Sequence, residues 1–566
     1  MKNALILFVF VLLGFCIRAV GIQWDQGTFL HPDERFLIMV TQDLSFPDSV
    51  NQYFSENSPL RVENTKHSFY VYGTFPVVIL KGLSLLFLKE PSFYSLTMLG
   101  RYLSLFLETA TIIGVYFLAQ YFTQKQKLPL KTPFWATLIY ACMVLPIQLS
   151  HFFAVDPFVT FFTLIAFLLF TLSERKNSLF WVALGSISWG LALSSKISAV
   201  FFAPLFVAFF FSLAFFTPQN FVVFQKPFGA FLRKFFMFTR YLFVLGVFTY
   251  ITVRIFNPEY FASLSWINPL PSPHLLKNLH SLKEWTQPTT WFPPSIQWLE
   301  RTPFVFSLTN LAFFGIGIWQ ALALLGGIVL IFLHHKKSFL SVTVLWTLGF
   351  FTWQSVQFVQ SLRYFYFLYP FFAVFAAFAL SSLQKKLKPK KSFMVSILLV
   401  IFVLVWPVMF LQIFLSPHTR VQATYWIREN IPAQSSILYE YWDDALPLSY
   451  VPGKQPSYEV TSLSVFDQDS PEKWMKIQPI FQSADYYTLT SNRAWASISR
   501  LPKRYPETSQ FYSDLFGGKT TYQLVRVFQS SPSLEWLGIP ITLDDSWSEE
   551  AFTVYDHPTV YIFKNE

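Results

Sequence analysis

The chain has 566 residues, of which 53% are hydrophobic, 20% are aromatic and only 13% are charged. A soluble chain would carry about a quarter charged residues, so this composition excludes an ordinary soluble enzyme. The formal net charge is +10, but most lysines and arginines lie in short loops between apolar runs, which indicates membrane topology rather than nucleic-acid binding.

Apolar runs long enough to cross a bilayer recur from the N-terminus to about residue 413. The first run, Ala4 to Ile22, has no cleavage pattern after it and carries Arg18, so we expect a retained span rather than a signal peptide. In all we expect about eleven membrane-spanning helices, at approximately 4–22, 102–122, 133–150, 157–173, 179–195, 197–216, 235–256, 310–333, 338–356, 364–384 and 392–413.

The apolar stretch 70–88 decides the topology. It contains Lys81, and a lysine in mid-bilayer costs about 2.5–3.5 kcal/mol on insertion scales. If this stretch does not span, every loop on the side of the N-terminus is short and basic, as cytoplasmic loops are. Those loops contain Lys125 to Lys131, Arg175 and Lys176, Lys226 to Lys234, Lys336 and Lys337, and Lys385 to Lys391. We therefore expect 70–88 to lie in the plane of the membrane, with the N-terminus cytoplasmic and the C-terminal domain extracytoplasmic.

Two acidic positions then fall in outer loops. The first loop contains His31-Pro32-Asp33-Glu34, and Asp156 follows the third span, five residues after His151. Each acid adjoins a proline, and both patterns also suit the first turn of a helix. We expect a surface helix from 33 to 44, with Asp33, Glu34 and Asp156 as candidate catalytic residues.

Three cationic side chains lie on the same outer side of the membrane, where the positive-inside rule does not favour them. Lys196 lies between two apolar runs, and Arg101 and Arg363 lie at the outer ends of others. A carboxylate near such cations could take a proton from an acceptor hydroxyl, while the cations hold the phosphate of a leaving group. This chemistry would suit a sugar carried on a polyprenyl phosphate.

Two other classes stay open. Arg18, Arg240 and Arg254 within apolar runs could line the path of a transporter or flippase of lipid-linked envelope intermediates, although no internal repeat is visible. A non-catalytic scaffold would leave the outward clustering of charges unexplained.

In order and spacing, these segments resemble the GT-C superfamily of polytopic membrane glycosyltransferases. The likeness is greatest to bacterial relatives of the protein O-mannosyltransferases and aminoarabinose transferases. The matching pieces are His31-Pro32-Asp33-Glu34, Gly100-Arg101, Ser150-His151 with Asp156, Gly190-Leu191-Ala192 leading to Lys196, and Arg363-Tyr364.

The resemblance implies an inverting transferase of the plasma (inner) membrane that uses a polyprenyl-phosphate sugar as donor. It implies in-plane helices in the first outer loop and Asp33 as the base, supported by Glu34 or Asp156. By the same resemblance Lys196, Arg101, Arg363, His151 and Tyr364 would bind the carrier phosphate or the sugar.

Residues 1–415 would form this transmembrane module, and 416–566 a soluble α/β domain outside the membrane. Helices are expected at 421–430, 471–483 and 507–516, and strands at 436–441, 486–491 and 521–529. Two β-rich runs, 551–556 and 559–564, predict a hairpin around Asp556-His557-Pro558. We expect this domain to gate or recognise the acceptor.

No metal-ligand spacing and no nucleotide-binding motif occurs in the sequence. A nucleotide-sugar donor is therefore not expected, whereas two carboxylates could still hold a divalent ion. The sugar, the carrier length and the acceptor, whether protein, lipid or glycan, are not readable from the residues.

Overall fold

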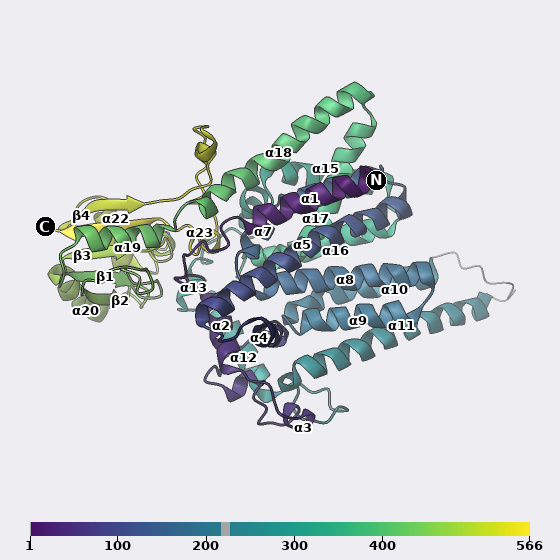
Figure 1. Ribbon diagram of the computed structural model, residues 1–566, viewed down its shortest axis with the longest axis horizontal. Coiled ribbons are helices and arrows are strands. Elements are labelled where there is room, and N and C mark those ends of the chain that lie inside the picture. Colours follow the sequence, from purple (N-terminus) through teal and green to yellow (C-terminus); the bar gives the residue numbers. More distant parts are fainter. Residues whose placement is uncertain (1, 217–226) are drawn as a thin grey trace.

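The computed structural model describes residues 2–216 and 227–566 as a bundle of long helices with a smaller sheet-containing domain at one end (Figure 1). Among these residues, six helices are long and apolar enough to cross a membrane, or eight if each of two bent helix pairs is one span. The predicted polytopic helical membrane protein with a small C-terminal α/β domain is confirmed.

The bundle and its loops contain α1 Lys2–Ala19, α2 Pro32–Asp43, α3 Val50–Tyr53, η1 Val62–Asn64, α4 Phe75–Phe87, α5 Phe93–Gln126, α6 Thr132–Ala141, α7 Val144–Ser150, α8 Val155–Lys176, α9 Leu179–Leu193, η2 Ile197–Phe202, α10 Ala203–Phe215, α11 Pro227–Phe256, η3 Pro258–Tyr260, α12 Pro273–Trp285, α13 Pro293–Ile296, α14 Val305–Asn310, η4 Leu311–Gly315, α15 Ile318–His334, α16 Phe339–Ser355, η5 Leu362–Leu368, α17 Tyr369–Lys385 and α18 Pro389–Leu415.

The number of long apolar helices is smaller than the predicted eleven because several predicted spans are short or broken. α1 and α9, with 18 and 15 residues, are shorter than the typical crossing of about 20 residues. The pair α6 and α7 is bent by 54°, and the helix before Gly317 meets α15 at 118°. Gly317 has a φ of +92°, a conformation that glycine adopts readily.

The outer-loop helices gather at the end of the bundle next to the C-terminal domain (Figure 1). The predicted helix at 33–44 is α2, and the stretch 70–88 contains the 13-residue α4. Figure 1 shows α4 nearly end on, across the direction of the long helices. A helix of this length and direction agrees with the in-plane arrangement that the charged loops favoured. Lys226, in one of the loops used for that argument, lies outside the described residues.

The C-terminal domain follows α18 and contains a mixed five-stranded sheet with the order β2-β1-β3-β5-β4. β1 is parallel to β2 and β3, whereas β5 is antiparallel to β3 and β4. Its elements are α19 Thr419–Asn430, β1 Ser436–Glu440, β2 Glu459–Leu463, α20 Pro471–Ser483, β3 Tyr486–Leu489, α21 Trp495–Ile498, α22 Pro506–Phe516, β4 Tyr522–Phe528, η6 Glu535–Leu537, α23 Glu550–Thr553 and β5 Val560–Asn565.

The hairpin predicted at the C-terminal end is wrong. Residues 550–553 form the short helix α23, and β5 pairs with β3 and β4 instead of with the preceding run. Phe552 of α23 packs against Phe314 and Phe410 of the bundle, so a tertiary contact outweighs the β propensity of this run.

The sheet joins the bundle through a continuous core. One cluster of buried side chains contains Ile437 and Ile562 of the sheet together with Phe410 and Phe414 of α18. A second cluster lies almost entirely within the C-terminal domain, around Tyr487. The domain therefore has a core of its own and is also packed onto one end of the bundle.

Candidate active site

Two of the predicted acids begin helices. Asp33 is the second residue of α2 after Pro32, and the ring of His31 caps this helix by accepting the Glu34 N–H. Asp156 is the second residue of α8. The helix-start interpretation of both sequences is therefore correct, and it also fixes where the two carboxylates point.

Arg363 of η5 joins the two acids. Its Nη1 lies 2.6 Å from Asp33 Oδ2 and its Nη2 lies 2.8 Å from Asp156 Oδ2. Lys196, between α9 and η2, places its Nζ 2.9 Å from Asp156 Oδ1. Four residues that are far apart in sequence thus form one chain of ion pairs, which we call the charged site.

The charged site is partly open. The side chain of Asp33 is 30% exposed and those of Arg363 and Lys196 are 15% and 16% exposed. A ligand can therefore reach Asp33 and both cations, while Asp156 at 5% is held behind them. Asp156 is placed to orient the cations rather than to touch a substrate.

Two tyrosines border the charged site. The Lys196 Nζ lies 5.3 Å from the ring centroid of Tyr364, within the range of a cation–π contact. Tyr72, which the sequence did not single out, is close enough to Asp33 and Arg363 to interact with them electrostatically. Burial raises the pKa of Tyr72 well above its ordinary value, so its phenol stays protonated and can donate a hydrogen bond.

Glu34 and Arg101 lie in a different, closed cluster. Arg101 donates to both Glu34 and Asp25 at 2.6–3.2 Å, and all three side chains are 1% exposed. Glu34 also accepts the Phe153 N–H at 2.8 Å. This buried cluster fixes the first outer loop against α5, and its guanidinium has no accessible face for a phosphate.

His151 is likewise enclosed. Its ring nitrogens lie 2.8 Å from the carbonyl oxygens of Ile147 and Val20, and its ring stacks on Phe414 at 3.6 Å. Burial lowers the pKa of His151 to about 4, against the opposing effect of its two carbonyl partners. The geometry suits a residue that ties α7 to the first outer loop.

The ionisation of Asp33 depends on its partner. Burial alone would raise the pKa of the Asp33 carboxyl, but Arg363 and His31 outweigh it and hold the pKa below its ordinary value. Asp33 is therefore ionised at neutral pH, and it is a weaker base while Arg363 is paired with it.

The C-terminal domain contributes residues that sequence reasoning missed. Glu549 accepts the Leu362 N–H at 2.7 Å and the Ser361 hydroxyl at 3.1 Å, directly before Arg363. The ring of Tyr555 lies 4.5 Å from that of His31, beside Asp33. No local sequence signal marks either residue, because each acts through a contact with a segment far away in the chain.

A metal site is not preformed by the usual ligands. Among residues 2–216 and 227–566, no group of three or more His, Cys, Asp or Glu side chains is arranged to hold a metal ion. Asp33 carries the accessible carboxylate of the charged site, and Asp156 carries the one next to it. These two carboxylates could share a divalent ion with a bound phosphate.

Comparison with known proteins places this geometry in context. Residues 81–259 match the family model described as dolichyl-phosphate-mannose-protein mannosyltransferase. The matched range includes Asp156 and Lys196 of the charged site. No curated protein matches the sequence.

Solved structures show a similar fold over nearly the whole chain. The apo oligosaccharyltransferase of Archaeoglobus fulgidus is 14% identical with a TM-score of 0.50, covering 99% of this chain and 88% of that one. AglB from the same organism, in complex with an inhibitory peptide and a dolichol-phosphate, is 14% identical with a TM-score of 0.52, covering 98% and 77%. ArnT from Cupriavidus metallidurans bound to undecaprenyl phosphate is 11% identical with a TM-score of 0.45, covering 88% and 95%. The resemblance to GT-C membrane glycosyltransferases is confirmed by the family match and the archaeal folds.

Proposed function

We propose, from the mannosyltransferase family match and the GT-C fold, that this protein is a glycosyltransferase of the plasma membrane. It moves a sugar from a polyprenyl-phosphate donor to an acceptor hydroxyl or amine at the outer face. The observation that carries the proposal is the charged site, where an accessible carboxylate, Asp33, lies beside two accessible cations, Arg363 and Lys196.

The cations suit the phosphate of the carrier. Lys196 and Arg363 converge on Asp156, which holds both in place without covering them. A phosphodiester bound by these two groups would gain negative charge as the bond to the sugar breaks, and fixed cations stabilise that charge most strongly in the transition state. Tyr364 and Tyr72 border the same space.

Donor binding would also activate the base. A phosphate that takes over Arg363 draws the guanidinium away from Asp33, and the pKa of Asp33 then rises toward its ordinary value. The acceptor oxygen or nitrogen attacks the anomeric carbon, Asp33 takes the acceptor proton, and the bonding pair of the broken C–O bond leaves with the phosphate. Direct displacement of this kind inverts the anomeric configuration.

The test is consumption of labelled polyprenyl-phosphate sugars, mannose first, by the full-length protein in liposomes, with and without a chelator. We expect Asp33→Asn to fold normally and to lose activity at least a hundredfold, the contribution of a general base. Asp48→Asn, an exposed acid of the same loop, is the matched control and is expected to keep wild-type activity.

Glu34→Gln separates chemistry from folding. It weakens the buried pairing of Arg101, so a lower unfolding temperature is expected together with any loss of activity. Wild-type activity in Asp33→Asn would refute the base assignment. If wild-type protein consumes no donor and instead moves it across the bilayer, the flippase hypothesis replaces the enzyme.

A further inference from the structure

Two neighbouring cavities open where the C-terminal domain meets loops of the bundle, and Trp442 lines both. The inner cavity, of about 250 Å³, is bounded by Pro32 and Arg35 of α2 and by Arg493 and Tyr555 of the C-terminal domain. The outer cavity, of about 260 Å³, is bounded by Trp291, Tyr441, Asp467 and Gln468. The inner cavity therefore reaches the residues that flank Asp33.

The outer cavity has an aromatic lining that remains accessible. Trp291 is 40% exposed, Tyr441 52% and Trp442 39%, so each of these aromatic residues keeps a substantial surface open to a ligand. Asp467 and Gln468 supply a carboxylate and an amide beside these rings. Flat apolar faces next to hydroxyl-binding side chains match a pyranose, which has apolar C–H faces and a rim of hydroxyl groups.

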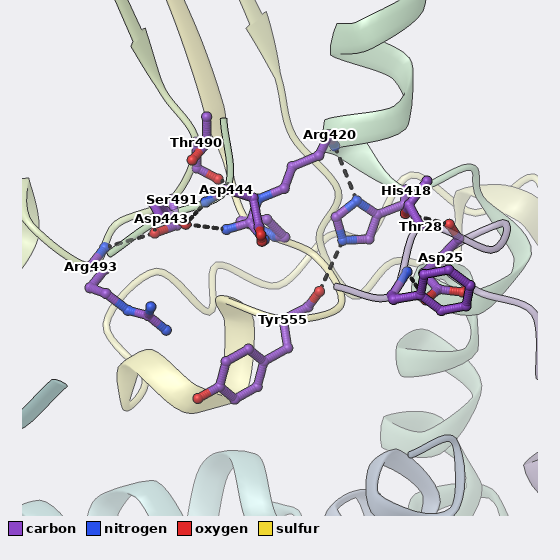
Figure 2. Close-up of polar contacts among 12 residues, drawn as sticks. Asp25, Thr28, His418, Arg420, Asp443, Asp444, Thr490, Ser491, Arg493 and Tyr555 are labelled. Atoms are coloured by element: carbon purple, nitrogen blue, oxygen red, sulfur yellow. Dashed lines mark hydrogen bonds and ion pairs between the residues drawn. The ribbon is translucent and has the colours of Figure 1, made fainter. Parts of the chain in front are cut away.

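The inner cavity, which lies toward Asp33, also offers hydrogen-bonding side chains. Arg420 is occupied by Asp443 and Asp444 at 2.6 and 2.8 Å, and Figure 2 shows it together with Ser491, Arg493 and Tyr555. Arg493 uses its Nε for Glu550 and one Nη for the Trp442 carbonyl. Its other Nη makes no hydrogen bond within the part of the chain that the structure describes, so this group is available to a ligand.

The backbone of Trp442 is held in an unfavourable conformation. Its φ is +78°, which is rare and strained for a bulky residue. The 2.6 Å hydrogen bond from Arg493 to its carbonyl helps to hold it there. Strain of this kind commonly marks ligand sites, and here it falls at the residue that lines both cavities.

We propose that these two cavities bind the acceptor and that the acceptor is a carbohydrate, an inference that rests on the proposed function. One sugar unit would stack in the outer cavity against Trp291, Tyr441 and Trp442. The next would lie in the inner cavity near Arg493 and Tyr555, with a hydroxyl directed toward Asp33. A peptide is the competing acceptor, and the test below separates the two.

The test measures acceptor binding and donor chemistry separately, on the full-length protein in nanodiscs. Binding of gluco-, manno- and chito-oligosaccharides, and of a pool of Ser-, Thr- and Asn-containing peptides, is followed by saturation-transfer NMR. Transfer to each compound is followed by mass spectrometry, and donor hydrolysis is measured without acceptor. The variants are Trp442→Ala and Trp291→Ala, with Tyr425→Ala as control because Tyr425 is 42% exposed on α19 and lines neither cavity.

We expect at least one oligosaccharide to bind and to be glycosylated. Trp442→Ala and Trp291→Ala should each weaken its binding at least tenfold, while Tyr425→Ala keeps wild-type binding and wild-type donor hydrolysis. Equal binding by Trp291→Ala and wild type, or transfer only to peptides, would overturn the carbohydrate inference. Failure of wild-type protein to hydrolyse any donor would instead count against the proposed function. The binding measurements would still test whether the cavities bind carbohydrate.

Discussion

Asp33 and Glu34 are consecutive residues with different surroundings. Neighbouring residues of a helix point about 100° apart, so Asp33 faces Arg363 in the charged site and Glu34 faces Arg101 in the closed cluster. The sequence predicts that both acids lie at a helix start in an outer loop. It cannot predict which cation each acid meets, because Arg101 and Arg363 are presented by α5 and η5, far along the chain.

Glu549 allows a test of how the charged site is positioned. Burial raises the pKa of Glu549 to about 7, against the opposing effect of its hydrogen bonds to Leu362 and Ser361. A carboxyl with a raised pKa in the folded state stabilises the fold while it is protonated, and this contribution is lost as pH rises from about 4.5 through 7.

Glu549→Gln keeps a carbonyl acceptor for the Leu362 N–H and does not ionise. We therefore expect the variant to gain stability relative to wild type between pH 5 and pH 8, by up to about 3 kcal/mol at 1.4 kcal/mol per pKa unit. Thermal unfolding of both proteins across this range measures the difference, with the exposed Glu429→Gln as control. A difference that does not change with pH would show that Glu549 is already ionised in the fold.

At the scale of elements, the start of α4 is fixed to the turn that presents Lys196. The Gly73 N–H donates to the Ser195 carbonyl at 2.9 Å, and the Phe75 N–H donates to the Ser194 carbonyl at 3.1 Å. A Cβ on Gly73 would lie 1.8 Å from the Ser194 oxygen. Only glycine permits this approach, which holds the in-plane helix against the charged site.

Gly73→Ala should push α4 and the Lys196 turn apart and lower donor turnover at least tenfold. Gly82→Ala, within α4, is the control, because its Cβ would meet only the Phe46 ring at 3.7 Å. That change should leave turnover unaltered and stabilise α4 by about 0.5–1 kcal/mol. Equal turnover in the two variants would rule out a positioning role for this contact.

Sequence patterning identified most elements of the C-terminal domain to within a few residues, because serine or proline marks the starts of α20 and α22 and apolar runs mark β1, β3 and β4. It missed β2, an edge strand. The first three residues of β2 are exposed and only one of them is apolar, so no apolar run marks this strand. It also misread α23, since that helix forms against the bundle.

At the scale of the whole molecule, the charged loops predict the orientation. In a Cys16→Ser background, where the remaining Cys142 is buried, Lys454→Cys should react with a membrane-impermeant thiol reagent on intact cells. Lys388→Cys, exposed before α18, should react only after the membrane is permeabilised. The reverse labelling pattern would place the charged site at the cytoplasmic face and exclude a donor presented outside.

The contact between Glu549 and Leu362 has a consequence for biosynthesis. The two residues are 187 positions apart, so the η5 segment is inserted long before its partner is translated. The segment before Arg363 would therefore lack the support of Glu549 until the C-terminal domain has been made and packed onto the bundle. If the proposed function holds, a chain truncated before Glu549 should be inserted yet inactive.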